Sequence, residues 1–336
     1  MITILDPVTN GNYSFRDFFD LNNPNDFTLI EDSNYSAPVD VLIHNPVAYM
    51  PLEDLPYNYR TLLFMDTRHN YENQIAELCK NKTPRFVITN ARDVNYNDPR
   101  ILFNDYLFNR TKAYYSDYVF SGNARWLHRT HKEYTVPVDD VALKNKIYIA
   151  PNRTYTVNDE PQQRIYRKQL MSLLKQQYRD LGHLGDPADP EIGHLPSNCS
   201  RVFGGYAPPH NRYFESTFIS IYTETIEFGT TFVATEKTFD PLIKGHLILP
   251  FCNSKFIGNL KHYYGFEFPD FIDYSYDDIE DTQQRYHAYQ EEVKRLLTFT
   301  LDQWQQHWIS TKVLRMHNQQ VFADRPYHRT DLTDIG

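Results

Sequence analysis

The first half of the chain alternates short apolar runs with longer polar stretches. Runs of β-branched and large apolar residues at Val39–His44, Thr61–Met65 and Arg85–Thr89 predict buried strands. Between the last two runs, Tyr71–Lys80 carries apolar residues at helical spacing and predicts a helix. Strand, helix and strand at this spacing are typical of βαβ units in a mostly parallel sheet.

The same alternation returns in the second half. Lys146–Ala150 and Ser216–Thr223 predict strands, and Gln162–Leu181 between them predicts a long amphipathic helix. The segment Gly182–Ser200 is rich in Gly, Pro, Asp and His without a clear period, so we expect a loop there.

Helical patterns dominate the rest of the chain, interrupted by one strand. A short helix is predicted at Thr238–Lys244, a strand at His246–Phe251, and helices at Thr282–Leu297 and Leu301–Gln319. We expect the last helix, with Trp304 and Trp308, to pack across the seam between the two domains as core.

The length of 336 residues corresponds to about two domains at roughly 150 residues each. The patterns predict the α/β class, with one α/β unit over residues 1–143 and a second over 144–300. Residues 301–336 are expected to form a closing helix and tail.

Composition excludes several classes of protein. A net charge of −9 disfavours a protein held to nucleic acid by phosphate contacts, although a local basic patch stays open. Three widely spaced cysteines exclude a disulfide scaffold and a CxxC zinc site, and they suggest a reducing compartment. The first residues lack the pattern of a signal peptide, and no apolar run approaches the ~20 residues of a membrane span. We therefore expect a cytoplasmic protein.

Polar residues follow the predicted strands of the first half. Because ligands bind beyond the carboxyl ends of parallel strands, His44, Asp66 and Asp93 are candidate site residues. The alternative is structural, since strand-to-helix loops are polar in any α/β protein.

The familiar nucleotide and metal motifs are absent. The sequence contains no GxGxxG after a strand, no GxxxxGK[ST], no HExxH and no GxSxG. The pairs Asp277-Asp278 and Glu280-Asp281 could hold a divalent ion, but we favour a solvated acidic turn that caps the following helix.

The tetrapeptide Thr235-Glu236-Lys237-Thr238 lies at a predicted helix N-terminus. Backbone N–H groups there point toward an anion, the lysine adds a positive charge, and both threonine hydroxyls can donate, which suits a phosphate-bearing donor. The glutamate would repel a phosphate, so we expect it to accept from a sugar hydroxyl such as those of ribose. The alternative is a helix cap with a surface Glu–Lys pair.

The residues around this tetrapeptide form a longer frame. Its members are Glu224 at a strand end, the block Thr235–Phe239, the turn and strand Gly245–Phe251, the Leu-x-x-x-x-Gly-Phe element Leu260–Phe266, the pair Tyr276-Asp277, and Arg285. Over residues 145–300 the chain resembles a family of glycosyltransferase-like proteins with a fucosyltransferase-like C-terminal domain, found in large viruses, phages and bacteria.

The resemblance implies a GT-B architecture, in which two Rossmann-like domains face each other across a cleft and the C-terminal one holds the donor nucleotide. For the matching positions of this chain, the resemblance implies that Lys237 binds the diphosphate and that Glu236 binds the ribose. It also implies that Arg153 contacts a second phosphate and that Glu224 lines the donor site. Such enzymes usually need no metal, because basic side chains and a helix dipole offset the charge of the leaving diphosphate. The GDP- or UDP-linked sugar is a substrate, so no cofactor is expected. Thr238-Phe239-Asp240 departs from the usual aromatic-Asn-Ala continuation, which leaves the sugar and the nucleotide open.

The leading hypothesis is therefore a metal-independent, inverting glycosyltransferase acting on a glycan or other hydroxyl acceptor. Inversion needs a general base near the acceptor hydroxyl. Asp66 is the first candidate, followed by His44 and Asp93, although each could instead be structural or bind the acceptor.

Two alternatives remain. One is a transferase that modifies hydroxymethylated phage DNA, with nucleic acid as a less favoured partner contacted by a loosely basic region. That region comprises Arg110, Lys112, Arg125, His128, Arg129, His131 and Lys132. The other is a non-catalytic carbohydrate-binding or virion-associated protein with a degenerate transferase fold.

Overall fold

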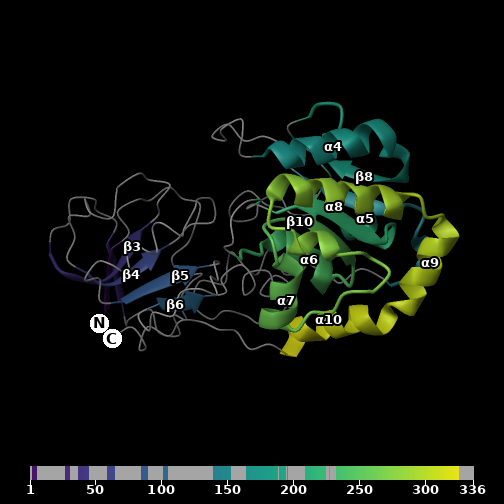
Figure 1. Ribbon diagram of the computed structural model, residues 1–336. Helices are drawn as coiled ribbons and strands as arrows, with labels where there is room; N and C mark the ends of the chain where they lie inside the picture. The colour runs from purple at the N-terminus through teal and green to yellow at the C-terminus, as the bar shows by residue number, and fades with distance from the viewer. Residues whose placement is uncertain are drawn as a thin grey trace.

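Two parallel β-sheets organise the chain, and helices pack on the second (Figure 1). The computed structural model describes residues 2–5, 27–30, 37–44, 59–64, 85–89, 101–104, 139–152, 164–187, 189–193, 195, 209–224, 227 and 232–324. In the first half the description is of the strands, largely of their backbone. The predicted helix Tyr71–Lys80 lies outside the described residues.

The first sheet has six parallel strands in the order β2-β1-β3-β4-β5-β6. The order reverses beside β1, as in doubly wound sheets. The strands are β1 (Ile2–Leu5), β2 (Phe27–Ile30), β3 (Val39–His44), β4 (Tyr59–Phe64), β5 (Arg85–Thr89) and β6 (Ile101–Asn104). The predictions for β3 and β5 are confirmed with their bounds, and β4 begins two residues earlier than predicted.

The second sheet has four parallel strands in the order β10-β9-β7-β8. They are β7 (Tyr148–Pro151), β8 (Gly182–Gly185), β9 (Ile219–Thr223) and β10 (Leu247–Phe251). The second half is therefore α/β with a Rossmann-like parallel sheet, as predicted.

Strand β8 corrects the expectation of a loop over Gly182–Ser200. The strand pairs with β7, so that Gly182 lies opposite Tyr148. A Cβ atom at Gly182 would lie 2.5 Å from the Tyr148 ring, and glycine is therefore required there. A glycine demanded by packing removed the apolar signal from which a strand is predicted.

Helices of the second half are α4 (Ile165–Gln177), α5 (Asn211–Glu215), α6 (Glu236–Ile243), α7 (Phe256–Tyr264), α8 (Thr282–Leu297), α9 (Leu301–Ser310) and α10 (Lys312–Asp324). Helix α8 has its predicted bounds. The single predicted helix over Leu301–Gln319 is instead two, because the Thr311 hydroxyl bonds back to the carbonyls of His307 and Trp308. None of the helices described here is both long and apolar enough to cross a membrane.

The two faces of the second sheet carry different helices (Figure 1). On one face α4 and α8 pack together, with the rings of Tyr166 and Tyr286 4.6 Å apart. On the other, Phe239 of α6 contacts Tyr264 of α7 and Phe322 of α10. Trp304 and Trp308 of α9 are buried in the same core as the second sheet, and no described contact tests the expected packing across the domain seam.

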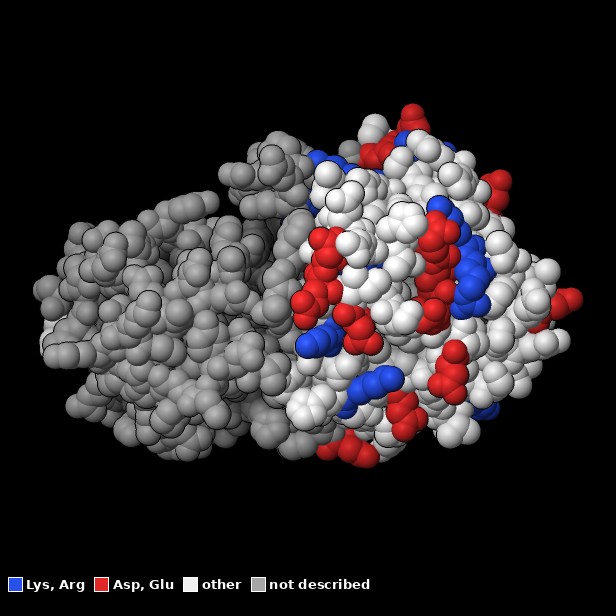
Figure 2. Space-filling model, in the orientation of Figure 1, with Lys and Arg blue, Asp and Glu red and all other residues white. Residues whose placement is uncertain are grey.

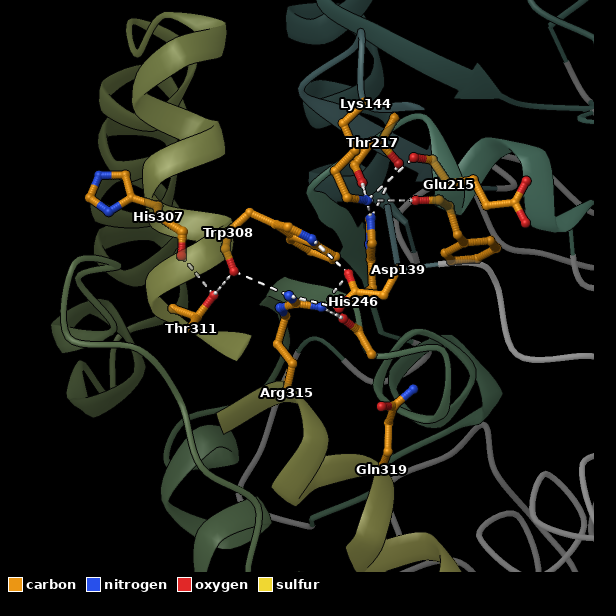
Figure 3. Close-up of polar contacts among 12 residues, drawn as sticks. Asp139, Lys144, Glu215, Thr217, His246, His307, Trp308, Thr311, Arg315 and Gln319 are labelled. Carbon is orange, nitrogen blue, oxygen red and sulfur yellow. Dashed lines mark hydrogen bonds and ion pairs between the residues drawn. The ribbon is translucent and has the colours of Figure 1, made fainter. Parts of the chain in front are cut away.

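A polar cluster anchors α9 and α10 to the amino-terminal edge of this sheet (Figure 3). We call Asp139, Lys144, His246, Trp308 and Arg315 the amino-edge cluster. Lys144 Nζ lies 3.7 Å and Arg315 Cζ 3.4 Å from the centroid of the Trp308 ring, so that both cations contact the indole. Asp139 accepts from Trp308 Nε1 at 2.8 Å and from Arg315 Nη1 at 3.1 Å.

The cationic groups of this cluster have partners inside the protein. Lys144 donates to the carbonyls of Phe214, Glu215 and Thr217. Burial, together with the nearby charge of Arg315, lowers the Lys144 pKa to about 7. His246 is also buried, which lowers its pKa, and its ring nitrogens bond to Ser220 Oγ at 2.8 Å and to the Thr217 carbonyl at 2.9 Å.

Candidate functional site

The carboxyl-terminal edge of the second sheet contains the point where its strand order reverses. Strands β7 and β9 are neighbours, and β8 and β10 extend the sheet in opposite directions. In doubly wound sheets ligands bind beyond the carboxyl ends at this reversal. Asn152 and Glu224 directly follow β7 and β9, and α4 and α6 lead from this edge to the next strands. We call this region the carboxyl edge.

Helix α6 begins within the tetrapeptide that the sequence singled out. Thr235 is the N-cap, and its hydroxyl accepts from the backbone N–H of Lys237 at 3.3 Å. The helix starts at Glu236, two residues earlier than predicted. The aligned peptide dipoles of the helix give this end a partial positive charge. The capping arrangement that the sequence left open is therefore present, at the sheet edge where a ligand is expected.

Glu224 is buried and bound to the start of α6 by three hydrogen bonds. Its Oε1 accepts from the Thr235 N–H at 3.0 Å and from the Thr238 hydroxyl at 2.5 Å, while its Oε2 accepts from the Thr235 hydroxyl at 2.7 Å. The Tyr222 hydroxyl in turn donates to Thr238 Oγ1 at 2.8 Å. The Glu224 carboxylate thus fixes the position of α6 relative to β9.

Lys237 is brought into the same group of residues. Its Nζ lies 3.2 Å from Thr235 Oγ1 and 3.9 Å from Glu224 Oε2. The side chain keeps 14% of its surface exposed, whereas that of Glu224 is fully buried. A cation that is partly exposed at a helix N-terminus is well placed to meet an anion from solution.

A second network holds the ends of β7 and β9 together. The Asn152 side-chain oxygen accepts from the Thr223 N–H at 3.2 Å. Arg167, on α4, donates from Nε to the Thr223 hydroxyl at 2.6 Å and from Nη2 to the Glu224 carbonyl at 2.7 Å. Arg167 is only 2% exposed, so its positive charge lies inside the carboxyl edge.

Glu227 is a buried acid three residues after Glu224. It is 1% exposed, and neither carboxylate oxygen has a hydrogen-bond partner among the described residues. Burial raises the Glu227 pKa to about 7, against the opposing effects of Arg167 and Arg164. The Thr223 hydroxyl and the Tyr166 N–H also lower the pKa, without completing a hydrogen bond. A buried polar group of this kind costs free energy and calls for an explanation.

Arg285 connects the loops around the site. Its guanidinium donates to the carbonyls of Glu227 at 3.1 Å, Cys252 at 3.0 Å and Ile279 at 2.6 Å. These carbonyls belong to the loops after β9 and β10 and to the segment before α8. Arg285, which the sequence frame included without a role, is therefore a structural link.

The predicted solvated acidic turn is wrong for Asp277 and confirmed for Asp281. Asp277 is 4% exposed and accepts from the N–H groups of Phe256 and Ile257, so it caps α7 rather than the following helix. Burial raises the Asp277 pKa to about 7. Asp281 is the N-cap of α8 and accepts from the Gln284 N–H.

The structure thus brings together Glu224, Thr235, Lys237 and Thr238, four of the predicted site residues. Glu236 opens α6, but the description does not extend to its side chain. His44 is placed by its backbone at the carboxyl end of β3. The remaining predicted residues lie outside the described part of the chain, and these are Arg153, Asp66 and Asp93.

Two residues of the carboxyl edge were missed by sequence reasoning. Arg167 looks like a solvated position on an amphipathic helix, and no local signal marks it as buried. Glu227 follows Glu224 by three residues, and the sequence alone does not show which of the two carboxylates has hydrogen-bond donors in the folded protein. Across the described residues, no group of three or more His, Cys, Asp or Glu is arranged to hold a metal ion.

Comparisons with known proteins complete the description of the site. No family model matches the chain, and no curated protein sequence matches it. Among solved structures, the chain is similar to the crystal structure of an α1,3-fucosyltransferase, with a TM-score of 0.40 and 11% sequence identity. The similarity covers 98% of this chain and 92% of that one. A similarity of this size does not identify the family of the chain.

Proposed function

We propose that this protein transfers a sugar from a nucleotide-sugar donor to a hydroxyl-bearing acceptor, and that the carboxyl edge of the second sheet binds the donor. One observation carries the proposal. Lys237 lies partly exposed in the first turn of α6, beside the point where the strand order reverses. The sequence frame from Glu224 to Arg285 gives independent support.

The donor diphosphate is assigned to Lys237 and the start of α6. The helix N-terminus and the ammonium group both favour an anion, and the diphosphate would bind beside Lys237 Nζ, which lies 3.9 Å from Glu224 Oε2. Arg153 directly follows Asn152 in the chain, and we assign it a second phosphate contact. Glu236, the first residue of α6, is assigned to the ribose hydroxyls.

These groups also provide a route for catalysis. Negative charge develops on the departing nucleoside diphosphate, and positive groups held in place stabilise it. Lys237 and Arg153 serve this role in our proposal, so the transfer needs no metal. Inversion requires a general base from the first sheet, with Asp66 as the first candidate and His44 and Asp93 after it.

An acceptor on duplex DNA is less well supported. Lys and Arg side chains are interspersed with Asp and Glu over the described part of the face in Figure 2. Duplex binding needs basic residues gathered on one face. The basic region of the sequence, residues 110–132, lies outside the described residues.

The test is thermal unfolding of the full chain with GDP, UDP, ADP, CMP and dTDP. A ligand at ~100 times its dissociation constant adds about 2.7 kcal/mol and raises the midpoint by several degrees. We expect one nucleotide to give this shift and Lys237→Ala to abolish it. Lys294→Ala removes an exposed lysine paired with Glu291 and is the matched control. A shift that survives in Lys237→Ala overturns the site, and no shift with any nucleotide favours the non-catalytic binding protein.

A further inference from the structure

Glu224 and Glu227 lie three residues apart after β9, and the fold treats them in opposite ways. All the side-chain hydrogen bonds described for Glu224 go to Thr235 and Thr238, at the start of α6. Glu227 is equally buried, yet both of its oxygens lack a partner among the described residues. Glu224 therefore has a structural role, whereas the fold alone does not account for Glu227.

The groups that face Glu227 come from several elements. The N-terminus of α4 is one of them, and its N-cap Arg164 makes no side-chain cap bond. The titratable and charged neighbours are Arg164, Tyr166 and Arg167 of α4, Arg285 and Tyr286 of α8, and Cys252 after β10. Most of the nearby full charges are positive, which makes this part of the carboxyl edge attractive to an anion.

Glu227 is also connected to Lys237 through Glu224. Arg167, whose charge faces Glu227, donates to the backbone carbonyl of Glu224. The side chain of Glu224 reaches the start of α6, where Lys237 Nζ is 3.9 Å from Oε2. Arg167 and Glu224 therefore link Glu227 to the point at which an anion would bind beside Lys237.

We propose that Glu227 takes up a proton when a nucleotide sugar binds at the carboxyl edge, and that the resulting carboxylic acid donates a hydrogen bond to the diphosphate. The proton comes from solvent, and no covalent bond of the ligand changes. A neutral acid is a donor, whereas the carboxylate only accepts and repels the anion. This inference rests on the proposed function and adds the regulation of the same site by pH.

The sign of the pH dependence follows from linkage. Free Glu227 titrates near its raised pKa of about 7. A bound anion raises that pKa further, so the complex holds more protons than the free protein. Affinity then falls as the pH rises through the interval between the two values. A rise of one pKa unit on binding corresponds to about a tenfold loss of affinity across it.

Titration calorimetry measures this coupling directly. The full chain is titrated with GDP-fucose, GDP-mannose, UDP-glucose and dTDP-glucose at pH 7.5, in two buffers of different ionisation enthalpy. A terminal phosphate group takes up a proton near pH 6. In these ligands both ends of the diphosphate are esterified, so the diphosphate itself takes up no proton in this range. We expect uptake of a fraction of a proton and a dissociation constant that rises about tenfold from pH 6 to pH 9.

Two isosteric variants separate Glu227 from its neighbours. Glu227→Gln should abolish the uptake and flatten the pH dependence. Asp277→Asn is the matched control, because Asp277 is also buried with its pKa raised to about 7 but is partnered by the N–H groups at the start of α7. The Asp277→Asn variant should take up the same fraction of a proton on ligand binding as the wild type. Uptake that persists in Glu227→Gln, or disappears in Asp277→Asn, overturns the assignment.

A measurement on the wild-type protein avoids dependence on the variants. Carbon-13 NMR of glutamate-labelled protein should show one carboxyl group that titrates near pH 7 and moves to higher pH with the nucleotide sugar. Binding without proton uptake or such a shift overturns this inference and leaves the proposed function in place. Failure of every nucleotide sugar to bind overturns both.

Discussion

The two edges of the second sheet place buried charges in contrasting surroundings. At the amino edge, Lys144 donates to three carbonyls, and Arg315 is paired with Asp139 against the Trp308 ring. At the carboxyl edge, Glu224 has three donors, whereas Glu227 has no hydrogen-bond partner among the described residues. Strand termini supply polar groups at both edges. Among the described residues, the amino-edge cluster leaves one nitrogen of Arg315, Nε, without a hydrogen bond, whereas the carboxyl edge leaves the whole carboxylate of Glu227 without one.

This difference separates structural polar groups from candidate ligand contacts. The amino-edge cluster includes two groups with strongly shifted pKa values, Lys144 and His246, and each has several partners inside the protein. A shifted pKa therefore does not by itself indicate function, because burial shifts the pKa of structural groups as well. The position of Glu227 at the reversal of strand order adds the second observation.

The largest effect is expected from breaking the amino-edge cluster. Trp308→Ala removes a buried indole and its contacts with Lys144 and Arg315, and we expect it to lower the free energy of unfolding by about 4 kcal/mol. Chemical denaturation measures the loss. Ile309→Ala, at an exposed neighbour on α9, is the control and should change stability by less than about 0.5 kcal/mol.

Nucleotide binding sharpens this first prediction. If the two edges have separate roles, the folded fraction of Trp308→Ala binds nucleotide with wild-type affinity. A large loss of affinity in protein that is still folded would show that the edges are coupled, and the comparison would no longer hold.

The next effect is the pH dependence of stability at the carboxyl edge. The pKa of Glu227 rises from 4.5 in the unfolded chain to about 7 in the folded protein, so folding favours its protonated form. Stability from this group is present below pH 4.5 and is lost as the pH rises through 7. From pH 4.5 to a pH above 7, the free energy of unfolding of Glu227→Gln should increase by about 3 kcal/mol relative to that of the wild type. Denaturation at pH 4.5, 6 and 8 measures it, and a constant difference between the two proteins would contradict it.

Much of the fold could be predicted because its signals are local. The apolar runs of β3 and β5 and the period of α8 give their bounds directly. Strand β8 was missed because packing against Tyr148 requires Gly182, a residue that normally weakens a strand. The break between α9 and α10 was missed because it depends on hydrogen bonds of one threonine side chain, which leave the apolar period unchanged.

The candidate site was predictable only where it is continuous in sequence. Thr235, Lys237 and Thr238 share one helix start, and Glu224 reaches them across 11 to 14 residues. The surroundings of Glu227 come from much further away, since Arg285 is 58 residues along the chain. Contacts at that separation exist only once the sheet has formed.

A smaller effect is expected from Glu224→Gln. The amide nitrogen replaces an oxygen that accepts from Thr235 or Thr238, which leaves buried donors facing each other. We expect a loss of about 2 kcal/mol in the free energy of unfolding, together with weaker nucleotide binding because the start of α6 shifts. Glu291→Gln, at an exposed position of α8, is the control. Unchanged nucleotide affinity in folded Glu224→Gln would argue against its positioning role.

The smallest effect comes from the helix caps, and it separates stability from binding. Thr235 caps α6 at the carboxyl edge, while Thr300 caps α9 through a capping box with Gln303. Thr300→Ala should cost about 1 kcal/mol, measured by denaturation, because it leaves a helix N–H without its acceptor. Thr235→Ala loses the same kind of cap and also the hydroxyl that donates to Glu224, so we expect a cost of about 1 to 2 kcal/mol. Only Thr235→Ala should also weaken nucleotide binding, and Thr235→Ser should restore it, since the serine hydroxyl can still donate to Glu224 and accept from Lys237. If both alanine variants bind nucleotide equally well, the start of α6 acts only as a cap, and the donor site must be sought elsewhere on the carboxyl edge.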